Sequence, residues 1–399
     1  MRTRATKRIL VPILTSAHTQ RLKLEGILKY AKEKRGDIWM LQLDIGGFAR
    51  QRLLDLPGWK CDGIIAYVDN PKDRTAFANT SLPTVLIEPF SLAAAPDKPN
   101  VVSFVNDYRI EGETAARHFI DRHFQNFAYV GTAERTPWSK LRCDGFVDCL
   151  RHHGRECLVY PSLSSNERED FAQEMPRLSL WLKALPHPTA LFVAHDVRAR
   201  QILTAANAVQ LNVPQDIAVV SVDNDELLCE TATPPLSSIP TGDTSLGYAC
   251  GRALEELIKH RDCGRTIHTR HARVVCRTSS DITALPDPFV ARALSWIRNH
   301  LSENITSDDI ANGIGYSKRL LQARIQKALG TTLGSEIRRI RLMAAEELLS
   351  NTDMPICEIA EKCGFANVSH LSMRFRSAHC MTPLDYRRRA ACFQGSCPN

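Results

Sequence analysis

A pattern that occurs twice near the end of this sequence limits its fold more than any other feature: a short apolar helix, a glycine and a second amphipathic helix. In the later copy the first helix stops at Gly364, which suits a positive φ, and Asn367 can cap the next helix. Apolar residues then recur every three or four positions and are expected to face inward: Leu371, Phe375 and Ala378. The opposite face carries Ser369, Ser372, Met373 and Arg376. The pattern predicts a helix-turn-helix.

The earlier copy lies roughly fifty residues before it. Ser317 can cap a helix that ends near Leu329, with Gly330 as its stop. The inward positions are Leu321, Ile325 and Ala328, and the outward ones are Lys318, Arg319, Gln322, Ala323 and Gln326. Between the copies, apolar spacing over residues 333–350 predicts a long joining helix. Because an exposed second helix is what reads a DNA major groove, the sequence predicts binding of double-stranded DNA.

This stretch of roughly 105 residues resembles the DNA-binding domain of the AraC/XylS family. The paired helix-turn-helices, their spacing and the closing residues carry the resemblance: Pro383, Tyr386 and Arg387. The sequence departs from the family in two ways. Cys380 stands where a glycine is usual, and Leu371 and Ile325 stand where aromatic residues are preferred. These departures concern local stability rather than function.

The charge distribution is consistent with a nucleic-acid partner. The net charge is +7, of which residues 286–399 hold +4, from 15 basic and 11 acidic residues. Residues 316–341 contain seven basic residues and one acidic residue. A charge run alone is usually a solvated helix surface, but within a helix-turn-helix it indicates phosphate contacts.

The cysteines and the hydropathy exclude several classes of protein. The 13 cysteines include no Cys-x-x-Cys pair, so neither a ribbon-type zinc site nor a thioredoxin motif is expected. An odd, scattered set indicates a reducing compartment. No apolar run approaches 18 residues, so no membrane span is expected. The sequence predicts a cytoplasmic protein without metal or cofactor.

Before this stretch, short apolar runs alternate with amphipathic helices. Strands are expected at residues 9–14, 38–43, 63–68 and 83–87, then at 127–130, 156–160, 190–194 and 217–222. Strand–helix–strand spacing predicts parallel sheets with right-handed crossovers. We expect two α/β lobes, at about 8–105 plus a return segment and at 106–240. Such lobes meet at a cleft where the carboxyl ends of the strands bind ligands.

Three segments of the second lobe resemble the sugar-binding core of LacI/GalR-type repressors and periplasmic binding proteins: residues 186–196, 213–224 and 234–239. The resemblance covers about residues 8–280 and is stronger in the second half. That family normally carries its DNA-binding helices at the N-terminus, where only about eight residues precede the first strand here. We therefore expect a two-lobed α/β sensor domain (1–280), a linker (281–288) and an all-α AraC-type domain (289–392).

Two residues lead the candidates for contact with a ligand. Asp223 follows a strand, and the resemblance implies that it binds sugar hydroxyls; otherwise it is a turn or cap residue. Arg142 stands at the position of the family's sugar-binding arginine; otherwise it is a surface residue of a helix. Trp138 can stack on a sugar ring or pack within the lobe.

Four further candidates lie at strand ends. His195 stands where the family often has an asparagine or aspartate ligand contact. Asp196 can contact a ligand or cap the next helix. Asp107 lies at the crossing between the lobes, and Tyr67 follows a strand of the first lobe.

No catalytic motif accompanies these residues. The sequence contains no Gly-x-Ser-x-Gly, His-Glu-x-x-His or phosphate-binding glycine loop, and no Pro-Cys-His-Arg as in DNA-repair proteins with AraC-like helices. We predict a regulator of transcription that is not an enzyme. The resemblances imply a small sugar effector, such as the pentose xylose, a homodimer on an operator, and RNA polymerase as partner of an activator. The alternatives are a DNA-bound regulator or architectural protein without a sugar ligand, and a DNA-tethered enzyme.

Overall fold

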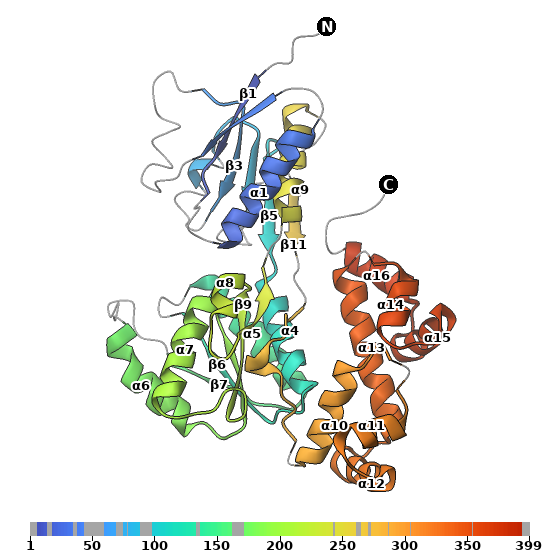
Figure 1. Cartoon of the computed structure of the whole chain (residues 1–399). Helices are drawn as coiled ribbons and strands as arrows, with labels where there is room; N and C mark the ends of the chain where they lie inside the picture. The colour runs from blue at the N-terminus through green and yellow to red at the C-terminus, as the bar shows by residue number, and fades with distance from the viewer. Residues whose placement is uncertain are drawn as a thin grey trace. The chain divides into compact units, whose positions relative to one another are not determined.

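The structure is a computed structural model with two compact units, residues 1–107 with 240–270 and residues 108–239 with 271–399 (Figure 1). It describes residues 6–13, 18–34, 38–43, 60–68, 75–77, 79–87, 98–132, 136–161, 171–241, 244–260, 265–269, 273–285, 287–303, 305–352 and 354–392. No helix among these residues is both long and apolar enough to cross a membrane.

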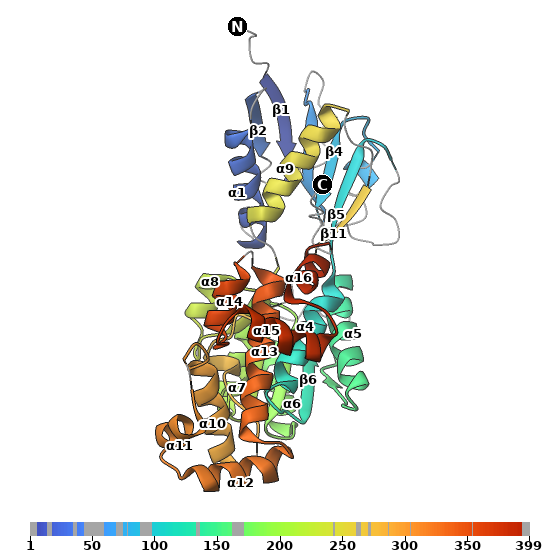
Figure 2. The same ribbon diagram turned by 90° about the vertical axis from the view of Figure 1, so that its right-hand side faces the viewer.

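The first unit is built on a six-stranded sheet of order β11-β5-β4-β3-β1-β2. Its strands are β1 (Thr6–Val11), β2 (Ile38–Leu43), β3 (Gly63–Tyr67), β4 (Thr84–Ile87), β5 (Val101–Asn106) and β11 (Arg265–Thr269). All the described pairings are parallel. Two helices lie side by side on one face, α1 (His18–Glu33) and α9 (Thr244–Ile258) (Figures 1 and 2). The return segment therefore supplies both a covering helix and an edge strand.

The second unit contains a five-stranded sheet of order β10-β9-β8-β6-β7. Its strands are β6 (Asn126–Val130), β7 (Leu158–Val159), β8 (Thr189–Val193), β9 (Ile217–Asp223) and β10 (Ser237–Pro240). We call this sheet with its helices and the residues 273–285 the second lobe. Short elements near its sheet are helix α8 (Glu226–Glu230) and the 3-10 helix η2 (Thr278–Ser280).

Helices cover both faces of the second lobe's sheet. Successive residues of one strand enter opposite cores: Leu191 packs with α6 (Phe171–Ala184) and α7 (Asp196–Ala208), whereas Phe192 packs with α4 (Tyr108–Ile120) and α5 (Pro137–His152). A strand buried on both faces needs apolar side chains at every position, which explains the unbroken apolar runs.

The rest of the second unit is helical. Its helices are α10 (Pro288–Asn299), α11 (Ser307–Ile314), α12 (Lys318–Leu329), α13 (Leu333–Asn351), α14 (Ile356–Lys362), α15 (Val368–His379) and α16 (Pro383–Cys392). One core packs α10, α11 and α12 on the first half of α13, and a second core packs α14 and α15 on its second half. The predicted fold class, an α/β sensor followed by an all-α domain with two helix-turn-helices, is confirmed.

The local signals of the helical part hold with one correction. The predicted caps are present: Asn367 accepts a hydrogen bond from the His370 backbone N–H at 2.8 Å, and Ser317 accepts one from Leu320. However, Ala328 and Ala378, which we predicted to face inward, are exposed. The larger side chains about one turn earlier, Ile325 and Phe375, are fully buried and fill the core at this end of each helix. The alanines that follow them therefore lie outside the core.

Cys380 is the C-cap of α15 and adopts a left-handed φ of 56°. The equivalent cap of α12 is Gly330, at φ 67°. A residue with a Cβ is disfavoured there by about 1 kcal/mol. We therefore expect Cys380→Gly to raise the stability of the helical domain by about this amount. Cys380→Ser, which removes the thiol but keeps the Cβ, should give no gain; equal melting temperatures for the glycine variant and the wild type would contradict the prediction.

Candidate functional site

The second lobe's candidate site is built where α4 and α5 cross. A Cβ on Gly112 would lie 2.1 Å from the Arg142 carbonyl oxygen, and one on Gly145 would lie 2.1 Å from that of Arg109. Only glycine permits this approach of the two backbones. The crossing sets Glu111 of α4 against Arg142 of α5, and Arg142 Nε donates to Glu111 Oε2 at 2.5 Å.

Arg142 is a buried cation with fixed partners. Its side chain is 4% exposed and that of Glu111 is 0% exposed. Its Nη1 donates to the Ala194 carbonyl at 2.6 Å, and its Nη2 lies 3.9 Å from Asp223 Oδ1. Burial alone would lower the pKa of Arg142, but the two carboxylates raise it above its usual range. The guanidinium therefore keeps its charge and its orientation.

Aromatic rings surround this guanidinium. Its carbon lies 4.7 Å from the ring centroid of Trp138 and 5.5 Å from that of Tyr108, within the range of cation–π attraction. The ring of His195 lies 5.9 Å from that of Trp138, edge to face. The predicted residues Arg142, Trp138 and His195 are thus brought together.

Asp223 ends β9 in a strained conformation. Its φ is 105° and that of Asn224 is 47°, so two successive non-glycine residues have positive φ. Such conformations persist only where their surroundings hold them, and they are frequent at ligand sites. The Asp223 side chain is 34% exposed, whereas its neighbours in the strand are buried. The turn presents a carboxylate at the end of the sheet beside Arg142.

Asp196 is 1% exposed and supports this turn. Its carboxylate accepts hydrogen bonds from Ser221 Oγ at 2.5 Å, Ser238 Oγ at 2.6 Å and the Asp225 backbone N–H at 2.7 Å. Burial, and secondly the charge of Asp223, raises the pKa of Asp196. The cap of the next helix, which we predicted as the alternative role of Asp196, is His195 instead. Because the Asp196 oxygens are engaged by β9, β10 and the start of α8, the arrangement favours support of this turn over contact with a ligand.

His195 caps α7 with its ring. Its Nδ1 accepts a hydrogen bond from the Arg198 backbone N–H at 3.2 Å, so Nε2 carries the hydrogen. Burial, followed by the charges of Arg142 and Arg198, lowers the pKa of His195 to about 4. At neutral pH it is a neutral ring with one fixed N–H donor.

The two remaining candidates belong to the first unit. Tyr67 ends β3 and is partly buried, with the Lys23 ammonium 5.6 Å from its ring centroid. Asp107 follows β5 and is also partly buried. Each lies at the carboxyl end of a parallel strand.

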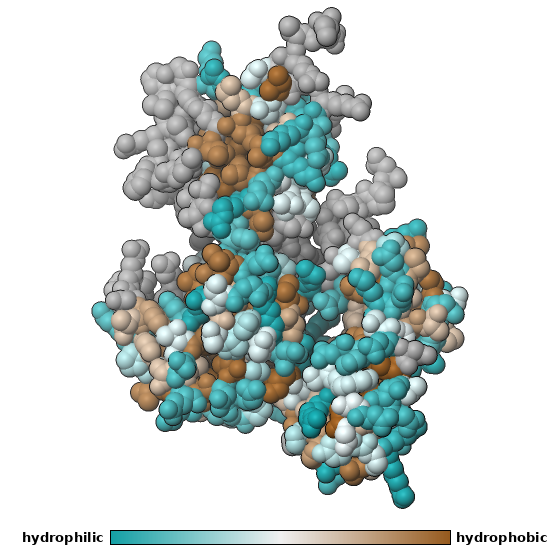
Figure 3. All heavy atoms as spheres, in the orientation of Figure 1, coloured by the Kyte–Doolittle hydropathy of each residue, from teal (hydrophilic) through white to brown (hydrophobic). Residues whose placement is uncertain are grey.

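The candidate DNA-binding residues lie on two exposed helix faces. Those of α12 are all exposed: Lys318, Arg319, Gln322, Ala323 and Gln326. On α15 and its cap, Ser372 is partly buried and the others are exposed: Asn367, Ser369, Met373 and Arg376. Hydrophilic side chains project at the end of the domain where α12 lies (Figure 3).

Two basic residues of this region are already paired. Arg324 contacts Asp287 at 3.1 Å and its guanidinium carbon lies 4.4 Å from the ring centroid of Phe289, so it fastens α12 to α10. Lys318 pairs with Asp308 of α11 at 2.8 Å, but both side chains remain exposed. Arg319, in the first turn of α12, is the exposed arginine placed to reach a groove.

Comparisons with known proteins match both parts of the chain. Residues 116–280 match the family model of a periplasmic binding protein-like domain, and residues 310–389 match that of a helix-turn-helix domain. The chain is 29% identical over 389 residues to the xylose operon regulatory protein of Escherichia coli (strain K12), covering 96% of this chain and 97% of that protein. The corresponding protein of Haemophilus influenzae is also 29% identical, over 82% of this chain and 84% of its own length. The chain is a transcription regulator.

The solved structures agree with this assignment. The xylose-binding transcription activator covers 96% of the regulator and 98% of its own chain, with a TM-score of 0.61 and 27% identity. A transcriptional regulator complexed with cellobiose has a TM-score of 0.55 at 19% identity over 70% of the regulator, which shows a shared sensor fold. Both resemblances predicted from the sequence, to AraC/XylS-type helices and to a LacI/GalR-type sensor, are confirmed.

Two residues of the candidate site were not predicted from the sequence. Tyr108 and Glu111 begin α4, and both contact Arg142. A signal for Glu111 was available: it precedes Ala115 and Phe119 at four-residue spacing, so it lies on the buried face of the helix. A carboxylate on such a face needs a cationic partner.

His195 makes the stability of the second lobe depend on pH. Its folded pKa of about 4 lies below the ordinary 6.5, so between these values the unfolded chain binds more protons. The unfolding free energy should therefore fall as the pH drops from about 6.5 towards 4. His195→Asn keeps a capping side chain and removes the titration, so its loss over this window should be smaller. Urea unfolding of both proteins at several pH values checks this, and parallel profiles would contradict it.

Proposed function

We propose that this regulator senses a monosaccharide, with D-xylose the first candidate, and that the bound sugar controls its affinity for a DNA operator. The observation that carries the proposal is the cluster in which a buried cation, a strained carboxylate and an indole ring meet at the carboxyl end of a parallel sheet: Arg142, Asp223 and Trp138. Sugars are bound by such sets, in which polar groups take the hydroxyls and an aromatic ring takes the apolar ring face.

Each side chain has a role in this proposal. The Asp223 carboxylate accepts hydrogen bonds from sugar hydroxyls. Arg142 donates to a sugar oxygen and is held for this purpose by Glu111. His195 contributes its Nε2–H. Asp107 and Tyr67, which lie in the first unit, stay separate predictions of contact with a ligand. The names of the related proteins support xylose as the first sugar to test.

We also infer the setting in which the regulator works. It acts by binding rather than by catalysis, in the cytoplasm, as a homodimer on two half-sites. Because the structurally similar relative is called an activator, RNA polymerase is the expected further partner. The inferred domain limits are 1–280 for the sensor, 281–288 for the linker and 289–392 for the DNA-binding domain.

Thermal melting of the full chain with D-xylose, D-ribose, L-arabinose and D-glucose tests the proposed sensing. A ligand at 100 times its Kd stabilises the folded protein by about 2.7 kcal/mol, which is a measurable shift. We expect one pentose to raise the melting temperature at a lower concentration than the other sugars do, and D-xylose is the first candidate. No shift with any sugar would instead favour a DNA-bound regulator without a sugar ligand.

DNA binding is expected to divide between base readout and phosphate contact. Arg319 and Gln322 lie on the exposed face of α12 near its start, where a recognition helix reaches base edges, and arginine prefers guanine there. Arg319→Ala should therefore cost about 1–3 kcal/mol on a DNA site selected with the full chain, and little on random DNA.

The matched variant is Arg376→Ala, on the exposed face of α15. It should weaken selected and random DNA alike, because a phosphate contact carries no sequence information. Each phosphate contact contributes about −0.9 to the log–log salt slope, so the wild type should show a slope of several units. A flat salt titration, or equal losses for both variants on both DNAs, would contradict these assignments.

A further inference from the structure

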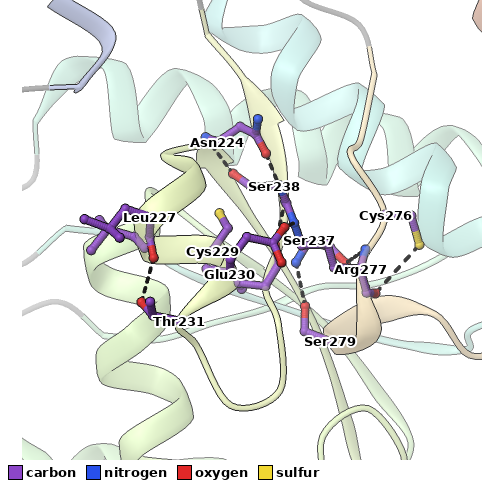
Figure 4. A network of polar contacts seen from close by, with 12 residues as sticks. Asn224, Leu227, Cys229, Glu230, Thr231, Ser237, Ser238, Cys276, Arg277 and Ser279 are labelled. Carbon is purple, nitrogen blue, oxygen red and sulfur yellow. Dashed lines mark hydrogen bonds and ion pairs between the residues drawn. The ribbon is translucent and has the colours of Figure 1, made fainter. Parts of the chain in front are cut away.

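Arg277 lies at the centre of a polar network in the second lobe (Figure 4). Its side chain is only 13% exposed, and it belongs to the segment between β11 and η2. Its Nη1 donates to Asn224 Oδ1 at 2.9 Å and to the Leu236 carbonyl at 3.0 Å, and its Nε donates to Glu230 Oε1 at 2.5 Å. One side chain therefore joins the residue before β10, the last residue of α8 and the turn after β9.

The contact with Asn224 bears directly on the candidate ligand site. Asn224 follows Asp223, and both have positive φ. The Asn224 backbone N–H donates to Ser238 Oγ at 3.0 Å, and Ser238 Oγ donates to Asp196. The strained turn is thus held from one side by Asp196 through Ser238 and from the other by Arg277.

Arg277 is also tied to the chain that leads to the helical domain. Its backbone N–H donates to Ser237 Oγ at 2.8 Å. Two residues later, the Ser279 hydroxyl donates to the Val219 carbonyl at 2.7 Å, and Ser280 bonds to His118 Nε2 at 2.9 Å. Ser279 and Ser280 are both 0% exposed. The segment 275–285, which we call the connection, is therefore packed and hydrogen-bonded as part of the lobe.

The connection continues to the first helix of the DNA-binding domain. The Ala284 backbone N–H donates to the Arg122 carbonyl at 2.8 Å, and Arg298 of α10 donates to Thr283 Oγ1 at 2.7 Å. An unbroken series of bonded residues thus runs from the turn at Asp223 and Asn224, through Arg277, to α10.

We propose that Arg277 is a positioning residue: it holds the turn that presents Asp223 to the sugar, and it ties that turn to the connection over residues 275–285. The proposal rests on the proposed function of Asp223 as a sugar contact. Arg277 touches no ligand itself; its part is to keep the Asp223 backbone at a φ that the turn does not adopt unaided.

Three single variants of the full chain test this role. Arg277→Met keeps the length of the side chain and removes its donors. Asn224→Gly accepts the positive φ without strain and removes the amide oxygen that Arg277 binds. Glu230→Gln is the control, because it removes the ionic partner on the more exposed side of Arg277, where Glu230 is 55% exposed, and leaves the turn contact in place.

The first measurement needs no sugar. Amide hydrogen exchange at position 224 should be faster in Arg277→Met and in Asn224→Gly than in the wild type and in Glu230→Gln, because the hydrogen bond between Arg277 and the turn is gone. Unchanged hydrogen exchange in both Arg277→Met and Asn224→Gly would overturn the proposal, whichever ligand the regulator binds.

The second measurement is D-xylose affinity by calorimetry. Arg277→Met and Asn224→Gly should each bind D-xylose about tenfold more weakly than the wild type. The double variant that combines them should bind no more weakly than either single variant, and Glu230→Gln should bind within about twofold of the wild type. The proposal would be overturned if the two losses of affinity multiplied in the double variant, or if Arg277→Met and Asn224→Gly both kept the wild-type affinity. A wild type that fails to bind D-xylose refutes the proposed sugar and leaves the exchange test standing. If Arg277→Met fails to fold, Asn224→Gly carries both measurements.

Discussion

Glu111→Ala is expected to lower the unfolding free energy of the second lobe by about 3–5 kcal/mol, the loss found when one partner of a buried ion pair is removed. The reason is the burial of Arg142, which is 4% exposed and donates from Nε to the Glu111 carboxylate at 2.5 Å. Without Glu111 the guanidinium keeps its bond to the Ala194 carbonyl and its 3.9 Å approach to Asp223, which compensate only part of its desolvation.

A matched pair in the same lobe provides the control. Glu174 and Arg198 are also buried, with Arg198 Nη1 and Nη2 donating to the two carboxylate oxygens at 2.7 and 2.6 Å. Glu174→Ala should destabilise the lobe to a similar extent, but only Glu111→Ala should also weaken sugar binding, because Arg142 loses its orientation. Urea unfolding followed by tryptophan fluorescence compares the midpoints of the same transition in both variants. A loss below about 1 kcal/mol for Glu111→Ala would contradict the prediction.

Removing both charges separates the ion pair from the packing. In Glu111→Leu combined with Arg142→Met, neither charge of this pair is left without its partner, so most of the lost stability should return. Sugar binding should not return, since the cation is gone. This pair of outcomes distinguishes a residue kept for binding from one kept for stability.

The helical domain was the part most predictable from sequence, because its signals are local. Ser317 and Asn367 cap helices within three residues of themselves, and Gly330 and Gly364 fix the helix ends by their own φ. Apolar periodicity placed the long α13 that both cores share. The alternation of strands and helices likewise predicted the parallel sheets of both units.

What sequence could not supply depends on contacts between distant residues. The strand β5 was not predicted, and neither was the helix α9 of the return segment. Helix α9 packs on α1, which lies more than two hundred residues earlier in the sequence. At the site, Arg142 and Asp223 were chosen from strand ends and resemblance, but Glu111 is 31 positions from Arg142 and Arg277 is 53 from Asn224. The strain at Asp223 is a property of its backbone geometry, which cannot be predicted from the residue type. The ligand and DNA roles of these residues stay predictions.

Asp223→Ala should abolish the effect of sugar on DNA affinity while leaving DNA affinity without sugar unchanged. Asp223 presents its carboxylate beside Arg142 at the end of β9, so its removal deletes the acceptor that we propose for sugar hydroxyls. The recognition helices α12 and α15 lie in separate cores and are not altered. Allosteric coupling is typically about 1–3 kcal/mol, so in the wild type the best sugar should change affinity for a selected DNA site about 5- to 150-fold.

The backbone at Asp223 requires a second variant, because alanine is itself strained at a φ of 105°. Asp223→Gly removes the same carboxylate and relieves the strain. If the carboxylate is what matters, both variants lose the sugar response equally, and the glycine variant is the more stable. A response retained in Asp223→Gly would mean that the turn, rather than the carboxylate, transmits the signal, and a response retained in both would remove Asp223 from the site. Titration of each protein with a selected DNA fragment, with and without D-xylose, measures the difference.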